Sequence, residues 1–327
     1  MQPAIISLPP SSSIWGPHIK RGVYLIGAPR CGTTAFSKVL ARNPQICFSK
    51  PKENHFFIRA SPILSAEEMS HAYLQRYFPS LNENHRAIAE GSVSYLYSSE
   101  AIKRIIELDP NGRFIVMVRN PIDMIYSYHA RLLFTMDEDV ADFEIAWNLQ
   151  EARRQGKQIP SRCRDLRLLQ YAAVGRLGEH VETLFKTAGR ERCFAIVFDD
   201  FIKDPIAVYK EVLEFIDIDY DGQTKIAQKN QNRGYKSHFL QQFVMNPPKF
   251  IVKFMEKREH LGLDQFAYLR AIRRRIKKIN KVEIKREPLS ESMRKKLHAA
   301  FADDIEKLVG LLNRNFEHWQ SSLWERR

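Results

Sequence analysis

A glycine-containing stretch, "YLIGAPRCGTTAF", has the residue types of a phosphate-binding turn with one substitution. On the pattern G-x-x-x-x-G-K-[ST], Gly27 and Gly32 take the glycine positions and Thr34 the hydroxyl position, but Thr33 stands where lysine is expected. Backbone N–H groups and hydroxyls can still bind a phosphate, and Arg30 inside the loop can supply a cation. The stretch therefore predicts an anion site, and the missing lysine weakens the case for a γ-phosphate. A glycine-containing turn that serves packing alone is the alternative.

A second anion site is predicted in "VRNPIDMIYSYH". Arg119 follows a buried apolar run, Pro121 is typical of a first helical position, and Ser127 lies about two turns along that helix. Ligands of open α/β sheets bind at the carboxyl ends of strands. Arg119 and Ser127 can therefore hold a second phosphate; the alternative is an arginine that caps the strand and a serine that faces solvent.

The elements that must position these residues follow from hydrophobic runs. Short apolar runs, each followed by polar or proline-bearing residues and a helix-like stretch, occur at 23–27, 86–90, 113–118 and 193–198. Strands that alternate with helices predict an α/β class, a three-layer α/β/α arrangement like that of P-loop NTPases, with a parallel β-sheet flanked by helices. Amphipathic segments 139–152 and 164–186 are predicted as helices, 219–237 as a long functional loop, and the C-terminal portion as helical.

The net charge of the 327-residue chain is +13, which favours acidic partners. Residues 251–296 hold 15 Lys and Arg against 6 Asp and Glu. This segment is either a solvated helical face or a docking surface for an anionic partner, and its interleaved apolar residues also permit weak contact with a membrane surface.

The four cysteines are widely spaced and form no C-x-x-C pair, which fits a reducing compartment better than a disulfide framework or a zinc site. The first 20 residues have no signal-peptide pattern, and no apolar run is long enough for a membrane span. We expect a loose leader over 1–20, a single domain over 21–327, and a cytoplasmic protein.

Four stretches in this order, "GAPRCGTTAF", "KENHFF", "VRNPIDMIYSYH" and the C-terminal "LSESMRKKLHAAFADDIEKLVGLLNRNFEHW", resemble sulfotransferases that use 3′-phosphoadenosine 5′-phosphosulfate (PAPS). The resemblance covers about residues 22 to 319 and is greatest to the heparan-type and other carbohydrate enzymes. It implies PAPS as sulfuryl donor and no metal. Arg119 and Ser127 then match the 3′-phosphate site, and the 5′-phosphosulfate loop comprises Arg30, Cys31, Gly32, Thr33 and Thr34.

The same resemblance assigns catalytic roles. An acceptor must lose a proton as it attacks sulfur, so a general base is needed. The family's Lys-Glu-x-x-Phe-Phe stretch makes Glu53 that base, while His55 is the alternative, as in the cytosolic enzymes that act on small phenols and steroids. Arg30 replaces the family's usual lysine and is expected to stabilise the leaving group electrostatically. Lys52 is a weaker candidate near the sulfate; the alternative for the whole run is an exposed polar segment.

Two further stretches match less closely. "AEGSVSYLY" resembles a family segment in which an acidic residue is followed by Lys, Ser or Thr, and Pro, but Gly91 replaces the Lys and Val93 the Pro. Its residues Glu90, Ser92 and Tyr95 are expected to line the acceptor side, or the tyrosine bonds back to a loop. The pair Arg233 and Gly234 stands where the family often has a basic-Gly element over the 3′-phosphate and adenine.

The predicted function is transfer of the sulfuryl group of PAPS to a hydroxyl or amine. A carbohydrate is the favoured acceptor, and the basic surface suits an already anionic glycan, while a lipid or a secondary metabolite is also compatible. One alternative is a P-loop kinase that uses Mg-ATP, with Asp199 and Asp200 at the end of an apolar run as magnesium ligands. Another is a binding protein for nucleic acid or an acidic polymer built on 251–296, although no nucleic-acid motif is recognised.

Overall fold

The computed structural model describes residues 13–59, 65–224, 226, 233–235, 237, 275, 279–283 and 287–321. It divides into two compact units. The first comprises Met1–Met124, Arg176–Lys229 and Ala300–Arg327, and the second comprises Ile125–Gly175 and Asn230–Ala299. A single domain beginning at residue 21 stays a prediction.

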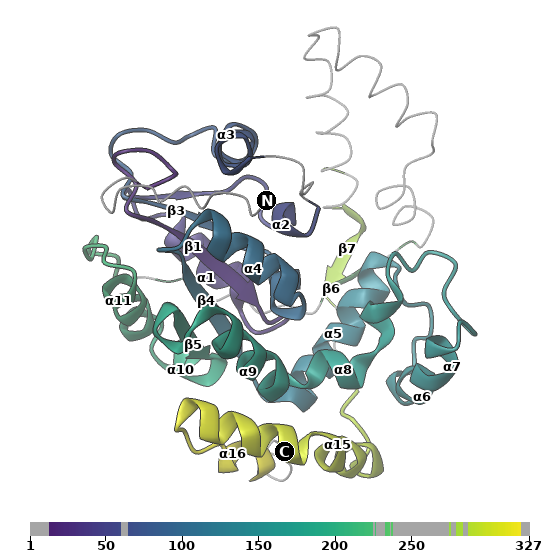
Figure 1. Ribbon diagram of the computed structural model, residues 1–327. Helices are drawn as coiled ribbons and strands as arrows, with labels where there is room; N and C mark the ends of the chain where they lie inside the picture. The colour runs from purple at the N-terminus through teal and green to yellow at the C-terminus, as the bar shows by residue number, and fades with distance from the viewer. Residues whose placement is uncertain are drawn as a thin grey trace, which may run out of the picture. The chain divides into compact units, whose positions relative to one another are not determined.

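The first unit is built on a parallel five-stranded sheet in the order β2-β3-β1-β4-β5 (Figure 1). Its strands are β1 (Arg21–Gly27), β2 (Ile46–Phe48), β3 (Ala87–Glu90), β4 (Arg113–Val118) and β5 (Cys193–Val197). Six residues of β1 and all four of β3 are buried, as expected for strands covered on both faces. The predicted α/β class is confirmed, and β2 is the strand that the apolar runs did not indicate.

The first unit also contains several helices. They are α1 (Thr33–Leu40), α2 (Phe56–Arg59), α3 (Ala66–Tyr77), α4 (Ser99–Leu108), α9 (Leu177–Ala188), α10 (Phe198–Lys203), α11 (Pro205–Phe215) and α16 (Glu317–Ser321), with the 3₁₀ helices η1 (Val93–Tyr97) and η3 (Arg190–Arg192). Of these, α1, α4, α9 and α10 lie near the sheet (Figure 1). Helix α3 begins with a capping box between Ser65 and Glu68. Helix α4 packs on α9 through a strongly apolar face. The helix α15 (Glu291–Leu312) runs from residues of the second unit into residues of the first, as does α5 (Pro121–Thr135) in the opposite sense.

The strand order places a topological switch point beside β1. From β1 the chain passes through α1 to β2 on one side, whereas after β4 it continues to β5 on the other. The connections after β1 and β4 therefore leave neighbouring strand ends in opposite directions, and ligands of open α/β sheets bind at the carboxyl edge beside such a point.

The second unit contains α6 (Phe143–Asn148), α7 (Gln150–Arg154), η2 (Leu166–Leu169), α8 (Tyr171–Gly175) and the antiparallel pair β6 (Arg233–Tyr235) and β7 (Lys281–Glu283). The helix predicted over 139–152 is thus two short helices, which begin after the Asp142 cap and break at Leu149. The helix predicted over 164–186 is also wrong as one helix, because Asp165 caps a 3₁₀ turn and the non-helical backbone of Arg176, with φ −75° and ψ 68°, separates α8 from α9.

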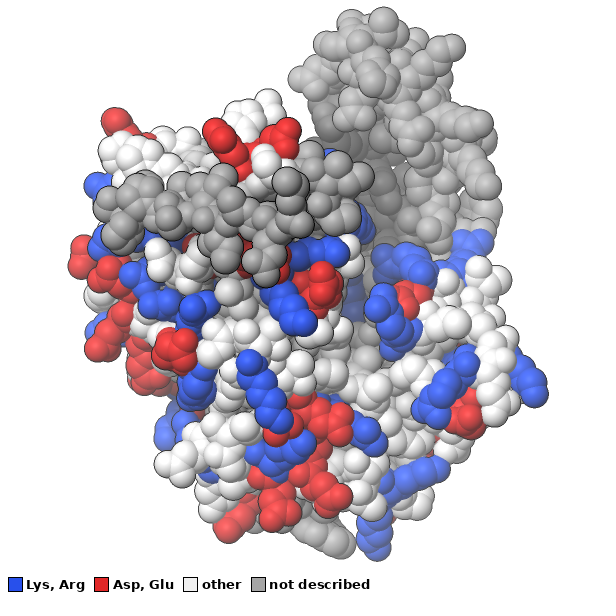
Figure 2. Space-filling model, in the orientation of Figure 1, with Lys and Arg blue, Asp and Glu red and all other residues white. Residues whose placement is uncertain are grey.

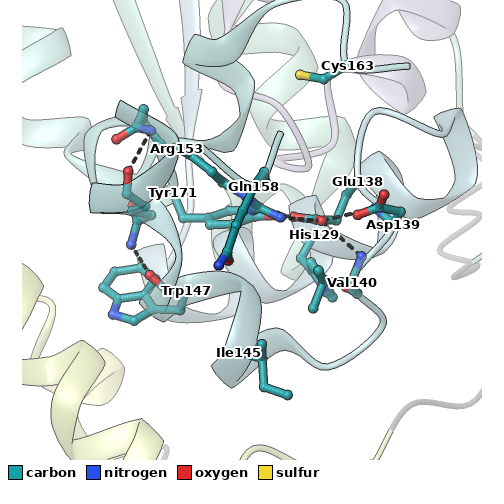
Figure 3. A network of polar contacts seen from close by, with 12 residues as sticks. His129, Glu138, Asp139, Val140, Ile145, Trp147, Arg153, Gln158, Cys163 and Tyr171 are labelled. Carbon is teal, nitrogen blue, oxygen red and sulfur yellow. Dashed lines mark hydrogen bonds and ion pairs between the residues drawn. The ribbon is translucent and has the colours of Figure 1, made fainter. Parts of the chain in front are cut away.

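The second unit contains a buried charge pair, Arg153 and Glu138 (Figure 3). Arg153 donates to both carboxylate oxygens of Glu138 at 2.7 Å, and neither side chain is exposed. Tyr171 also donates to Glu138, at 2.5 Å. Burial opposes ionisation of Glu138, but these hydrogen bonds outweigh it and lower the pKa of the carboxyl.

Two predicted segments have only partial descriptions. Residues 251–274 of the basic segment lie outside the described residues, and so do parts of 219–237, in which β6 forms. On the face drawn in Figure 2, basic and acidic side chains of the described residues are interspersed. Within the expected leader, Trp15 and Ile19 are buried, and the Trp15 ring packs against Tyr73.

Candidate functional site

The candidate site residues of the first unit lie at or just after the carboxyl ends of its strands. Because the five strands are parallel, these ends share one edge of the sheet. The segments that leave this edge are 28–32 after β1, 49–57 after β2, 91–95 after β3, Arg119 after β4 and Phe198 after β5.

The local geometry explains why both Gly27 and Gly32 of the anion loop are glycines. A Cβ at Gly27 would lie 2.6 Å from Leu96 Cδ2, so the residue allows close packing of η1 on the strand end. Gly32 has φ +92° and is the N-cap of α1. The first N–H groups of a helix have no intrahelical partner, so the start of α1 can bind an anion.

The other loop residues differ in exposure. Thr33 is 5% exposed, whereas Thr34 is exposed and Arg30 half-buried. Burial raises the pKa of the Cys31 thiol to about 12 despite the nearby Arg119 and Arg30. The thiol therefore stays protonated at neutral pH, and Cys31 contributes its backbone and volume to the loop rather than a nucleophile.

Arg119 lies directly against the anion loop. Its Nη1 donates to the backbone carbonyl of Arg30 at 3.5 Å, and its guanidinium lies 4.7 Å from the ring centroid of Phe198. Nη2 pairs with Asp123 at 3.4 Å, where the carboxylate is 46% exposed. Such an exposed pair is weak, so an incoming phosphate can compete for the guanidinium.

Ser127 lies on α5 among the residues of the second unit, and its pairing with Arg119 around one phosphate stays a prediction. The backbones of Arg233 and Gly234 form β6 in the same unit. Their role over the 3′-phosphate also stays a prediction, and the Arg233 side chain lies outside the described residues.

Glu53 is held from three directions. Its backbone N–H donates to the Gly91 carbonyl at 2.9 Å, its Oε2 accepts from the backbone N–H of Val93 at 3.0 Å, and its Oε1 pairs with Lys52 Nζ. The side chain of Glu53 is 34% exposed and that of Lys52 19%. The carboxylate is thus both oriented and accessible, as a general base requires.

The lysine stem fills space that a side chain at position 91 would take. A Cβ on Gly91 would lie 3.0 Å from Lys52 Cε and 3.3 Å from Phe48 Cζ. Gly91 stands where the stretch that this segment was expected to resemble has lysine. The lysine ammonium beside Glu53 therefore comes from Lys52, whose side chain occupies the space next to Gly91.

His55 lies on the same segment as Glu53. Its Nδ1 is 2.7 Å from Ser94 Oγ, and its backbone N–H donates to Ser92 Oγ at 3.1 Å. Seven described non-glycine residues have positive φ, and Arg30, Glu53 and His55 are three of them, at 65°, 64° and 55°. Strained backbone of this kind clusters at functional sites, which supports the choice of these residues as catalytic candidates.

Glu90, predicted to line the acceptor side, is instead the centre of a buried polar cluster. It is 1% exposed and accepts hydrogen bonds from Ser92, Tyr73 and Tyr95. Burial raises the pKa of Glu90 to about 7, against the opposing effect of the hydrogen bonds from Ser92, Tyr73 and Tyr95. The sequence pattern signalled the acidic residue but not its burial, because Tyr73 comes from α3, 17 residues earlier.

Asp199 and Asp200, the magnesium ligands of the kinase interpretation, bind the C-terminal segment. Asp199 Oδ2 accepts from the Trp319 indole N–H at 2.7 Å and lies 3.2 Å from His318 Nε2. Asp200 pairs with Arg314 at 2.9 Å. These contacts give the two carboxylates a structural role. Among the described residues, no group of three or more His, Cys, Asp or Glu side chains is arranged to hold a metal ion.

Comparisons with known proteins agree with this architecture. Residues 20–260 match the family model described as "Sulfotransferase domain". The chain therefore belongs to the sulfotransferase domain family, a family of transferases. The sulfotransferase from Alicyclobacillus acidocaldarius has the same fold, with a TM-score of 0.62, 22% identity, and coverage of 92% of this chain and 99% of that one.

Two curated relatives are similar in sequence. The chain is 26% identical over 201 residues to bifunctional heparan sulfate N-deacetylase/N-sulfotransferase 4 of Mus musculus, and 26% identical over 202 residues to the corresponding enzyme 3 of Homo sapiens. Each match covers 59% of this chain and 22% of the relative's length. None of the helices in the described part of the chain is long and apolar enough to cross a membrane.

Proposed function

We propose that the protein transfers the sulfuryl group of PAPS to a hydroxyl or amine of a carbohydrate and releases adenosine 3′,5′-bisphosphate. The observation that carries the proposal is the contact of Arg119 with the Arg30 carbonyl at the switch point of the sheet. It puts a second cation beside a phosphate-binding loop that has Thr33 in place of the lysine of nucleoside-triphosphate enzymes. A donor with two separate anionic groups and no γ-phosphate fits this arrangement.

In the proposed reaction the loop 27–34 and the start of α1 bind the 5′-phosphosulfate, and Arg119 with Ser127 binds the 3′-phosphate. The acceptor oxygen or nitrogen bonds to sulfur as the bond from sulfur to the bridging oxygen breaks. Negative charge then builds on the departing phosphate, where Arg30 and the loop N–H groups stabilise it. The acceptor's proton passes to a base on segment 53–55.

Glu53 is the preferred base. Its carboxylate is oriented by the Val93 N–H and remains partly exposed. The Lys52 ammonium beside it can approach an anionic sulfuryl group or an anionic acceptor. His55 is the alternative, since its Nδ1 is oriented by Ser94 on the same segment.

Similarity to heparan sulfate N-deacetylase/N-sulfotransferases supports a carbohydrate acceptor, with an amino sugar as the first to test. The high net charge of the chain favours an acceptor that is itself anionic. A cytoplasmic location stays a proposal from the sequence.

The proposal is tested by incubating the protein with PAPS carrying radioactive sulfur and N-desulfated heparan oligosaccharides, without added metal. We expect label in the oligosaccharide and an equal amount of adenosine 3′,5′-bisphosphate. Glu53→Gln should lower kcat by at least about a hundredfold, the range of general-base contributions, while His55→Ala lowers it less. Bisphosphate formation with no labelled sugar would rule out this acceptor, and no bisphosphate with any acceptor would rule out the reaction.

A further inference from the structure

The buried carboxylate of Glu90 sits at the centre of a cluster that the proposed reaction does not use. Its Oε1 accepts from Ser92 Oγ at 2.5 Å, and its Oε2 accepts from the hydroxyl of Tyr73 at 2.5 Å and from that of Tyr95 at 3.2 Å. Ser92, Tyr73 and Tyr95 are each 0% exposed. A buried carboxyl group is costly unless its oxygens are hydrogen-bonded, so all three contacts constrain the geometry of this centre.

Two of the three donors reach onward to the segment that carries the candidate bases. Ser92 Oγ accepts from the backbone N–H of His55 at 3.1 Å. The Tyr95 hydroxyl accepts from the backbone N–H of Phe57 at 3.2 Å. Hydrogen bonds thus connect Glu90 through the Ser92 and Tyr95 side chains to the backbone N–H groups of residues 55 and 57.

This segment needs external support. Glu53 and His55 both have positive φ, a conformation that costs about 1 kcal/mol or more for a non-glycine residue and persists only where neighbouring groups impose it. Asn54 between them is 4% exposed and accepts from the backbone N–H of Phe56 at 3.0 Å. The positions of the two bases therefore depend on the contacts that hold residues 53–57 to residues 90–95.

We infer that Glu90 is a positioning residue of the sulfuryl-transfer site, which acts through Ser92 and Tyr95 to hold Glu53 and His55 toward the acceptor. The inference rests on the proposed function. Glu90 itself is buried and takes no proton from the acceptor. Its effect is to keep the base-bearing segment in the one conformation that aims a proton acceptor at the edge of the sheet.

Three substitutions separate this role from general support of the core. Glu90→Gln keeps the shape but replaces one acceptor oxygen with a donor. Ser92→Ala removes one connection to the segment and leaves Glu90 in place. Tyr73→Phe is the matched control. The Tyr73 hydroxyl also donates to Glu90, but Tyr73 contacts the segment through its ring, whose centroid lies 4.8 Å from that of Phe56 and 5.1 Å from that of Phe57, and phenylalanine keeps that ring.

The first readout is amide hydrogen exchange of the folded protein, which does not depend on activity. We expect Glu90→Gln and Ser92→Ala to speed exchange in the peptide covering 53–57 by about fivefold to tenfold, the effect of losing one hydrogen bond. Exchange in α1 should not change, and Tyr73→Phe should have a smaller effect on 53–57. Unchanged exchange in 53–57 for Ser92→Ala, the variant with the smaller risk of misfolding, would overturn the inference.

The second readout is turnover of N-desulfated heparan oligosaccharide, with calorimetry of adenosine 3′,5′-bisphosphate. We expect kcat to fall about tenfold or more in Glu90→Gln and Ser92→Ala while bisphosphate affinity stays within about twofold, because the anion loop is not part of the cluster. Unchanged kcat would overturn the catalytic part of the inference. If the wild-type protein turns over no acceptor, the proposed function fails, and the exchange result still decides whether Glu90 holds the segment.

Discussion

The guanidinium of Arg119 stacks over the ring of Phe198, 4.7 Å from its centroid, at the carboxyl ends of two adjacent strands. A Cβ on Gly32 would lie 3.1 Å from the same ring, so Phe198 also packs under the anion loop. One buried aromatic side chain thereby contacts both parts of the proposed donor site. The ring restricts Arg119 to a position from which it can reach a phosphate held near the loop.

We predict that Phe198→Leu weakens binding of adenosine 3′,5′-bisphosphate by about 3- to 30-fold, the range of a cation–π contact of intermediate burial. Calorimetry measures this directly. Phe215→Leu is the matched control. The Phe215 ring centroid lies 5.8 Å from the guanidinium of Arg113, which is at the start of β4 and therefore at the opposite end of that strand from Arg119. Equal loss of affinity in the two variants would contradict a specific role for Phe198.

The raised pKa of Glu90 predicts a pH-dependent stability. In the unfolded chain the carboxyl has its ordinary pKa of 4.5, whereas burial in the fold raises it to about 7. The folded protein therefore binds the proton more tightly. This contribution is fully present below pH 4.5 and is lost as the pH rises through 7.

Glu90→Gln removes the titration. As the pH rises from 4.5 to above 7, the stability of the wild type should fall relative to this variant by on the order of 3 kcal/mol. Urea unfolding at a series of pH values gives the difference. A difference that stays constant from pH 4 to pH 8 would mean that Glu90 has an ordinary pKa in the fold.

Gly178 marks a close approach of two helices in the first unit. A Cβ there would lie 2.3 Å from the backbone oxygen of Asp304, whose carboxylate accepts from the Gly178 N–H at 2.8 Å. We predict that Gly178→Ala destabilises the protein by about 1–3 kcal/mol. Gly310→Ala, at an exposed helical position with no atom within 4 Å of the new Cβ, should stabilise it by roughly 0.5–1 kcal/mol. Thermal unfolding that shifts in the same direction in both variants would refute this packing.

The buried pair of Arg153 and Glu138 supports a third stability prediction. Arg153→Met leaves the buried Glu138 carboxyl without its main partner, so we expect a loss of about 3–5 kcal/mol. The neighbouring Arg154 pairs with Glu151 on the surface, where its side chain is 66% exposed. Arg154→Met should therefore cost less than about 1 kcal/mol. Comparable losses in both would show that burial does not distinguish the two pairs.

Much of the sheet could be predicted because its strands are apolar runs buried on both faces. The runs at 23–27, 86–90, 113–118 and 193–198 all correspond to observed strands. β2 was not predicted because it has only three residues. The single helices predicted over 139–152 and 164–186 are each two or more shorter elements. Their amphipathic pattern continues through turns, which are imposed by local caps at Asp142 and Asp165 that periodicity alone does not register.

The site was predictable where one local stretch carries the chemistry. The loop around Arg30 and the position of Arg119 could be predicted because each directly follows an apolar strand. In the structure these two residues are in contact. The buried state of Glu90 was not predictable, since it depends on Tyr73 from a helix that no motif includes. The packing of Lys52 against Gly91 was likewise not predictable, because it depends on the segments after β2 and β3 lying side by side.

The most direct test of the donor site is titration calorimetry with adenosine 3′,5′-bisphosphate and, separately, with ATP and Mg²⁺, on the wild type and on Arg119→Ala. We predict that the bisphosphate binds without metal at micromolar concentrations and that this binding is lost in Arg119→Ala, while ATP with Mg²⁺ binds far more weakly. Binding of ATP only, with Mg²⁺ required and with Arg119 dispensable, would contradict the sulfuryl-donor site.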